Sequence, residues 1–142
     1  MTATFAKHSL IASVLFSGLA FGGTVQAMDH ADVKVSNQSV AEGSVTAMQV
    51  MAPENGWLVV HRTGADHKPG PVVGYAPLKK GENAHVTALL SEPVKSGEML
   101  MLMVHSEAGG SKTGIFEYTL GAKEDGPIKP DGKLVMTVIT AE

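Results

Sequence analysis

Residues 98–106 read EMLMLMVHS, and this stretch decides the fold class. Successive side chains of a β-strand point to opposite faces. One face of this strand would carry Met99, Met101, Met103 and His105, and the other would carry Leu100, Leu102 and Val104. Because both faces are apolar, we expect the strand to be central and covered by protein on each side.

The chain after residue 30 repeats such runs on a shorter scale. Segments rich in Val, Ile, Leu, Met and Thr alternate with Gly, Pro, Asn and Asp at intervals of about ten residues, and no helix of useful length is predicted. We therefore expect an all-β, immunoglobulin-like antiparallel β-sandwich of about seven or eight strands. The strands are expected at Asp32–Ser36, Ser44–Met51, Trp57–Arg62, Val72–Ala76, Asn83–Leu90, Glu98–Ser106, Ile115–Leu120 and Leu134–Thr140.

Pro53-Glu54-Asn55-Gly56 is the strongest local turn signal. Asn-Gly supplies the two positive-φ residues of a tight hairpin turn, and apolar runs flank it on both sides. The strands Ser44–Met51 and Trp57–Arg62 are therefore predicted to pair antiparallel. In the second strand Trp57 and His61 share one face, and Trp57 is expected to be largely buried.

The first 27 residues have the features of a cleavable export signal. Lys7 and His8 provide a short basic start, and residues 9–21 form an apolar run that is too short to span a bilayer. Val25-Gln26-Ala27 places small residues where a signal peptidase reads, and cleavage there would leave residues 28–142 as a single domain. No later segment approaches the roughly 20 apolar residues of a membrane helix. We therefore expect a periplasmic or secreted protein without a membrane span.

The composition excludes several classes of function. The chain has 14 acidic and 11 basic residues, a net charge of −3, and no cluster of Lys and Arg, so nucleic acid is not an expected partner. It contains no Cys, which excludes thiolate nucleophiles and Cys-ligated zinc. It has no Gly-x-Ser-x-Gly motif, phosphate-binding glycine loop or His-Glu-x-x-His motif. We therefore expect a protein that binds and does not catalyse.

Cleavage of the signal would create an amino terminus that reads Met28-Asp29-His30. The α-amine, two deprotonated backbone amides and the imidazole of His30 can enclose Cu(II) or Ni(II) in a square plane, the geometry these ions prefer with nitrogen donors. Met28, Asp29 and His30 are thus the first candidate metal site. The alternative is a tail that carries a histidine by chance.

Histidines and methionines on the predicted strands form two further candidates. His61, His85 and His105 fall near the middle or end of strands, and three converging imidazoles could hold zinc or copper with an open position. Met101 and Met103 share a face with His105, and thioether and imidazole ligands together suit Cu(I). The alternatives are three separate histidines bonded to backbone or water, and methionines that fill the core.

A set of short segments follows one another in a characteristic order and spacing. They are Val33–Gln38, Trp57–His61, Val73–Ala76, Leu78–Gly81, His85–Thr87, Met101–His105, Gly114–Glu117 and Asp125–Pro127. Together they resemble a family of small β-sandwich domains of unknown function found in exported archaeal and bacterial proteins. The resemblance covers most of residues 28–142 and implies a β-sandwich and export, with no established activity. It directs attention to His61, His85 and His105, which lie within the matching segments.

These features predict an exported, non-catalytic binding protein that binds copper or another transition metal. The alternative is a structural or protein-interaction module of the cell envelope, without a metal, that contacts a partner protein through its loops or a strand edge. A ligand that binds only the folded state raises its melting temperature, so copper-dependent stabilisation would separate the two.

Overall fold

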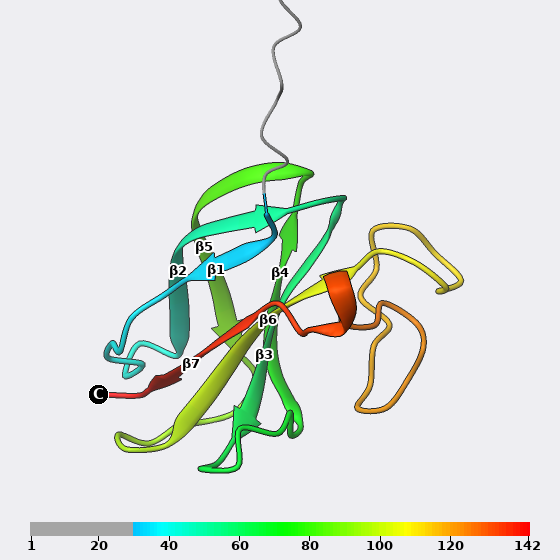
Figure 1. Ribbon diagram of the computed structural model, residues 1–142. Helices are drawn as coiled ribbons and strands as arrows, with labels where there is room; N and C mark the ends of the chain where they lie inside the picture. Colours follow the sequence, from blue (N-terminus) through cyan, green and yellow to red (C-terminus); the bar gives the residue numbers. More distant parts are fainter. Residues whose placement is uncertain (1–29) are drawn as a thin grey trace, which may run out of the picture.

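The computed structural model describes residues 30–142 (Figure 1). The expected export signal, with Met28 and Asp29 of the amino-terminal motif, lies outside the described residues. The structure is all-β, as predicted. Its strands are β1 (Asp32–Lys34), β2 (Ser44–Ala52), β3 (Gly56–Thr63), β4 (Val72–Leu78), β5 (Gly81–Leu90), β6 (Met99–Ser106) and β7 (Met136–Thr140), and a short 3-10 turn, Pro130–Gly132, precedes β7. Within this range no helix is long and apolar enough to traverse a lipid bilayer.

The seven strands form one antiparallel sheet in the order β1-β2-β5-β4-β3-β6-β7. Labelled A to G in chain order, they follow the immunoglobulin arrangement, A-B-E-D beside C-F-G. β4 and β5 are joined by only two residue pairs, so the two halves of the sheet separate there and fold over each other (Figure 1). β1 and β7 are the two outer strands of the sheet. Gln38, which follows β1, forms a bridge with Ala141 at the end of β7, and this bridge closes the sandwich into a barrel-like shape.

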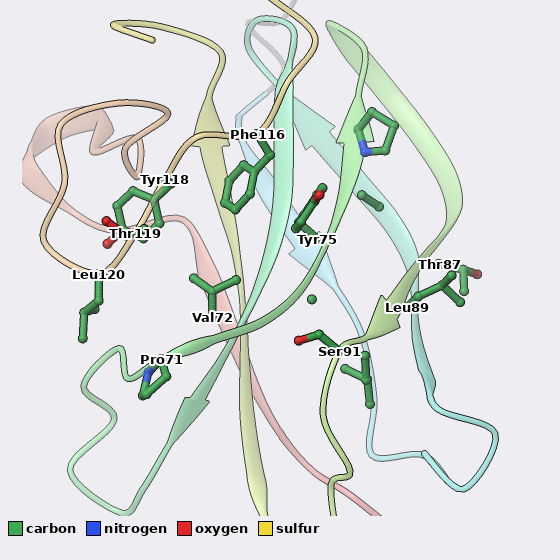
Figure 2. Close-up of a pocket in the computed structure, with 14 residues that line it drawn as sticks. Pro71, Val72, Tyr75, Thr87, Leu89, Ser91, Phe116, Tyr118, Thr119 and Leu120 are labelled. Carbon is green, nitrogen blue, oxygen red and sulfur yellow. The ribbon is translucent and has the colours of Figure 1, made fainter. Parts of the chain in front are cut away.

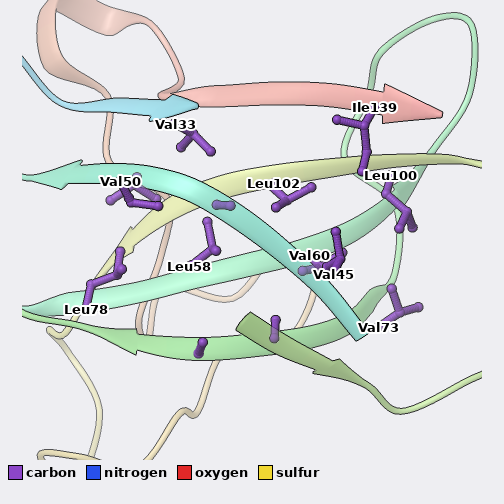
Figure 3. Close-up of a cluster of buried hydrophobic side chains, with 14 of the residues drawn as sticks. Val33, Val45, Val50, Leu58, Val60, Val73, Leu78, Leu100, Leu102 and Ile139 are labelled. Carbon is purple, nitrogen blue, oxygen red and sulfur yellow. The ribbon is translucent and has the colours of Figure 1, made fainter. Parts of the chain in front are cut away.

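One face of the sheet lines the interior of the sandwich. Figure 3 shows the side chains that meet there: Val33, Val45 and Val50 from β1 and β2, and Leu58, Val60, Leu100 and Leu102 from β3 and β6. All of them are at most 3% exposed. Burial of each such side chain contributes roughly 1.5–3 kcal/mol to stability, before the entropy of ordering is subtracted.

The opposite face of β3 and β6 is also buried, beneath residues 107–128, which we call the covering segment (yellow to orange in Figure 1). Its Phe116 ring lies 5.5 Å from the ring of Trp57, centroid to centroid, and Trp57 is 5% exposed. Met101 and Met103 of β6 are fully buried on this face. β6 is therefore covered on both faces and Trp57 is buried, as predicted.

The predicted hairpin between β2 and β3 is wrong. β2 pairs with β1 and β5, whereas β3 pairs with β4 and β6, so the link between β2 and β3 crosses between the two halves of the sandwich. Asn55 accepts a hydrogen bond from the backbone N–H of Lys80 through its side-chain oxygen (2.9 Å). Gly56 belongs to β3 and its φ is not positive, but a Cβ there would overlap the carbonyl oxygen of His105. Gly56 therefore allows β3 and β6 to approach each other closely, and it does not form a turn.

The strand expected at Ile115–Leu120 is not formed, and this part of the covering segment has no regular secondary structure. Within it Tyr118 is buried, whereas Ile115 and Leu120 are exposed. The backbone N–H of Glu117 donates to the carboxylate of Asp125 (2.8 Å). The buried carboxylate of Asp125 thus accepts a hydrogen bond from one backbone N–H of this stretch.

Candidate functional site

Two histidines approach each other on the outer face of β3 and β6. His61 pairs across the strands with Met101, and His105 pairs with Trp57, so the two positions are four residues apart along the sheet. Their Nε2 atoms nevertheless lie 3.3 Å apart, because the two rings lean toward each other. His61 is 0% and His105 is 1% exposed, which removes both imidazoles from solvent.

Each ring is held through its other nitrogen by a backbone carbonyl. Nδ1 of His61 lies 2.8 Å from the carbonyl oxygen of Gly70, and Nδ1 of His105 lies 2.7 Å from that of Asp125. A carbonyl only accepts hydrogen bonds, so each Nδ1 carries a hydrogen and donates it. In a neutral imidazole the remaining Nε2 then has a lone pair and no hydrogen. The two Nε2 lone pairs therefore face each other.

Burial favours the neutral form of both rings. Burial lowers the pKa of His105 to about 4, although the hydrogen bond to Asp125 opposes this, and the neighbouring His61 lowers the pKa further. Burial also lowers the pKa of His61, opposed by its hydrogen bond to Gly70. When both rings are neutral and both Nδ1 atoms carry the hydrogen, neither Nε2 can donate to the other. A cation between the lone pairs would stabilise such an arrangement.

The spacing of the two nitrogens fits a metal ion. Two imidazoles on one tetrahedral ion, with metal–nitrogen bonds of about 2.0–2.1 Å, have their nitrogens about 3.3–3.4 Å apart. The two Nε2 atoms are 3.3 Å apart. Hydrogen bonding of the other ring nitrogen to a carbonyl is also the arrangement that orients metal-bound histidines. His61 and His105 are therefore the residues that could hold a metal.

Aromatic rings close the site on the side away from the sheet. The Tyr118 ring meets the His105 ring edge-on at 4.5 Å and the His61 ring at 5.9 Å, centroid to centroid. Phe116 lies 6.4 Å from His105 and stacks on Tyr75 at 4.4 Å. The site is thus shielded from bulk solvent, and electrostatic interactions inside it are stronger than in water.

Asp125 fastens the covering segment over the histidines. It is fully buried, and its carboxylate accepts hydrogen bonds from the backbone N–H groups of Ala108 (3.1 Å) and Glu117 (2.8 Å). Its own carbonyl oxygen receives the Nδ1–H of His105. Its φ of +44° lies in the left-handed region, which Asp and Asn tolerate better than most residues. Asp125 therefore joins β6 to two separate parts of the covering segment.

An apolar groove of about 820 Å³ lies beside the histidine pair. Figure 2 shows it between β4, the end of β5 and residues 116–120. Leu89, one of the residues that line it, is 75% exposed. Tyr118 and Phe116 both line the groove and both lie against the ring of His105, so these two aromatic side chains stand between the groove and the pair.

Of the three strand histidines, the structure brings together His61 and His105 but not His85. His85 is exposed on β5, where it has a φ of +50°. Across residues 30–142 no group of three or more His, Cys, Asp and Glu side chains is placed to hold a metal ion. The convergence of three imidazoles is therefore not found in the described part of the chain, and a pair takes its place.

The amino-terminal candidate lies at the edge of the described structure. His30 is its first residue, exposed ahead of β1, whereas Met28 and Asp29 precede the described range. This site stays a prediction.

Sequence reasoning missed three residues of the covering segment that complete the site, Phe116, Tyr118 and Asp125. Phe116 and Tyr118 are two residues apart, a spacing that puts both side chains on one face of an extended chain. Asp-Gly-Pro at 125–127 is typical of a turn. Neither signal says which strands the segment covers.

Residues 31–142 match a family model described as Domain of unknown function (DUF7282). The chain belongs to this family. It matches no curated protein and no solved structure. The resemblance to a domain family of unknown function is thereby confirmed.

The DUF7282 match begins after His30 and runs to the end of β7 and beyond, to residue 142. It therefore contains His61, His105 and the whole covering segment. The histidine pair is a feature inside the family domain, whereas the sequence Met28-Asp29-His30 precedes that domain.

Proposed function

We propose that this protein is an exported, non-catalytic binding protein that holds a transition-metal ion, with copper as the first candidate, between Nε2 of His61 and Nε2 of His105. The proposal rests on one observation. The two Nε2 lone pairs face each other at 3.3 Å while both Nδ1–H groups are committed to carbonyl oxygens. Imidazole nitrogens suit copper and zinc, and an ion between them replaces the repulsion of two lone pairs with two coordinate bonds.

The surroundings of the pair favour binding over catalysis. A catalytic metal keeps one coordination position open to substrate. Here Tyr118 and Phe116 lie over the rings, and both histidines are at most 1% exposed. Access to the ion requires the covering segment to open, so we propose storage or transfer of the ion.

Export is supported by the first 27 residues, which carry the features of a cleavable signal. In the periplasm or outside the cell, the mature chain would begin Met28-Asp29-His30 and offer a second site, for Cu(II), at its amino terminus. Intact-mass analysis of exported protein checks the cleavage, and the expected mass is that of residues 28–142. A protein that retained residues 1–27 would have neither the predicted processing nor the terminal site.

Cu(I) titration of the mature protein tests the buried site. Under anaerobic, reducing conditions, native mass spectrometry should show one bound ion, and competition with a chromophoric chelator should give its affinity. His61→Asn and His105→Asn should each remove the ion, because either leaves a single imidazole. The matched controls, His85→Asn and His30→Ala, should retain it. A wild type that binds no ion, or binding that survives in both His61→Asn and His105→Asn, would overturn the proposal.

The groove favours a second candidate function, an interaction module of the cell envelope that binds a partner protein. Leu89 and Tyr75, which line the groove, are 75% and 49% exposed, and contiguous apolar surface of this kind marks interaction sites. A photoreactive residue at position 89 should crosslink to one defined envelope protein in cells. At Met48, which is 59% exposed but does not line the groove, it should not. Equal crosslinking at the two positions would count against this candidate.

A further inference from the structure

We propose that Met103 supplies a thioether sulfur as a third ligand between His61 and His105, and that the site therefore takes Cu(I) in preference to Zn(II). This inference rests on the proposed function and names the ion. Three observations support it: the register of β3 and β6, the burial of Met103, and the uncharged character of the three donor groups.

Met103 occupies the strand position midway between the two histidines. The register pairs, in order along the strands, are His61 with Met101, Val59 with Met103, and Trp57 with His105. At about 3.3 Å per residue, the outer two positions are about 13 Å apart along the strands. The two Nε2 atoms are nevertheless 3.3 Å apart. Each imidazole must therefore lean toward the middle position.

The middle position offers one donor atom. Val59 has no ligand atom, so Met103 is the one residue of this pair that carries a donor, its thioether sulfur. Met103 lies on the same face of β6 as His105, two residues away, and is fully buried. Its unbranched side chain has three rotatable bonds, so the sulfur can adjust to an ion held by the rings.

The lack of charge on the donor groups favours a monovalent ion. The donors are two neutral imidazoles and a thioether, and the rings of Tyr118 and Phe116 form the facing wall. Within residues 30–142 no carboxylate completes a metal-binding group with the histidines. Removing an ion from water is unfavourable in proportion to the square of its charge, so a divalent ion without an anionic ligand is disfavoured.

Ligand softness leads to the same ion. Thioether and imidazole ligands suit Cu(I), whereas structural zinc takes four ligands from Cys, His, Asp and Glu. A set of two nitrogens and one sulfur is sufficient for three-coordinate Cu(I) and incomplete for zinc.

X-ray absorption at the copper edge, combined with Cu(I) affinity, tests the role of Met103. Both are measured in a His30→Ala background, which removes the amino-terminal site. The loaded protein should show two nitrogen neighbours and one sulfur neighbour. Met103→Leu should lose the sulfur signal and at least about tenfold in affinity. Met101→Leu, which changes an equally buried methionine on the same face, should keep the sulfur signal and the affinity. A large excess of Zn(II) should not displace Cu(I) from protein that retains Met103.

The outcomes separate this inference from the function on which it rests. Protein that binds no metal overturns the proposed function. Protein that binds Cu(I) through His61 and His105 without a sulfur neighbour overturns the role of Met103, and displacement by Zn(II) overturns the selectivity.

Leu nearly conserves the volume of Met, so Met103→Leu should fold. Should it fail to fold, selenomethionine labelling in the Met101→Leu background gives the same test. A selenium neighbour at the copper edge supports Met103 as a ligand, and a spectrum with nitrogen neighbours alone overturns it.

Discussion

His61 and His105 owe their neutral state to burial and their tautomer to one carbonyl each. In an unfolded chain a histidine has a pKa of about 6.5. In the folded protein burial lowers the pKa of His105 to about 4. Between these two values the unfolded chain binds a proton that the folded chain does not, so the stability of the metal-free protein rises with pH across this interval.

The metal-free protein should therefore lose stability as the pH falls from about 6.5 toward 4. By pH ~4.5 the protonation of His105 in the unfolded chain should have lowered the free energy of unfolding by about 2–3 kcal/mol. Below pH ~4 both states are protonated at this residue and its contribution should stop changing. Urea unfolding at a series of pH values measures the effect. His105→Asn is the control, because its amide can still donate to Asp125 but does not titrate. The same decline in both proteins would contradict the assignment.

At the scale of elements, the pairing of β3 with β6 holds the histidines in register. It runs from Gly56 opposite Ser106 to Thr63 opposite Met99. At Gly56 a Cβ would overlap the carbonyl oxygen of His105, which is backbone and cannot move aside without breaking the ladder. The pairing therefore requires a residue without a side chain at this position.

Gly56→Ala should lower the free energy of unfolding by at least about 2 kcal/mol, because the added methyl group meets backbone on the neighbouring strand. Gly64→Ala is the matched control, since the nearest atom to its Cβ is a side-chain oxygen of Asp66 at 3.7 Å. Chemical denaturation of the two variants gives the comparison. Equal stability would show that β3 and β6 do not approach each other so closely.

The covering segment should depend on the carboxylate of Asp125. Asp125→Asn replaces one oxygen with an NH₂ group, which cannot accept from Ala108 or Glu117, so one buried N–H loses its acceptor at about 1–3 kcal/mol. Amide hydrogen exchange should become roughly tenfold faster within residues 108–125, while the strands stay protected. Asn tolerates a positive φ as Asp does, so backbone strain at position 125 would not explain the faster exchange.

Asp131→Asn is the control for this experiment. Asp131 is exposed and also has a positive φ, of +53°, so the same substitution is made in a similar backbone without a buried carboxylate. Unchanged exchange in Asp125→Asn, or faster exchange throughout the sheet, would contradict the local role of Asp125.

At the scale of the whole molecule, the histidine pair connects elements that are distant in sequence. The ring of His61 on β3 contacts the loop at Gly70, and the ring of His105 on β6 contacts the covering segment at Asp125. A metal ion between the rings would join β3, the loop at Gly70, β6 and the covering segment. Global unfolding breaks these connections, so occupancy of the site should be visible in the stability of the entire domain.

Cu(I) at roughly 100 times its dissociation constant should add about 2.7 kcal/mol to the stability of the folded state. For a domain of this size, the Tm should rise by about 10 °C. Calorimetry in the His30→Ala background measures the shift, and the additional pair of changes His61→Asn and His105→Asn should abolish it. A Tm that does not respond to Cu(I) would argue against an ion at the buried pair.

The sequence by itself determined the all-β class and the two faces of the central strand. The alternation in residues 98–106 and the shared face of Trp57 and His61 depend only on local strand geometry, which gives every second side chain the same direction. Burial of Trp57, Met101 and Met103 follows because an apolar face must be covered by something.

Only the tertiary structure decided which side chains meet. Asn55-Gly56 has the composition of a hairpin turn. The preference of this dipeptide for a turn is weaker than the pairing of β3 with β6, in which Gly56 allows the two strands to approach closely. His61 and His105 are 44 residues apart in the chain, and their meeting depends on strand register, on two carbonyls and on the burial of both rings. Strand periodicity assigns a side chain to a face but not to a neighbour, because neighbours are set by long-range packing.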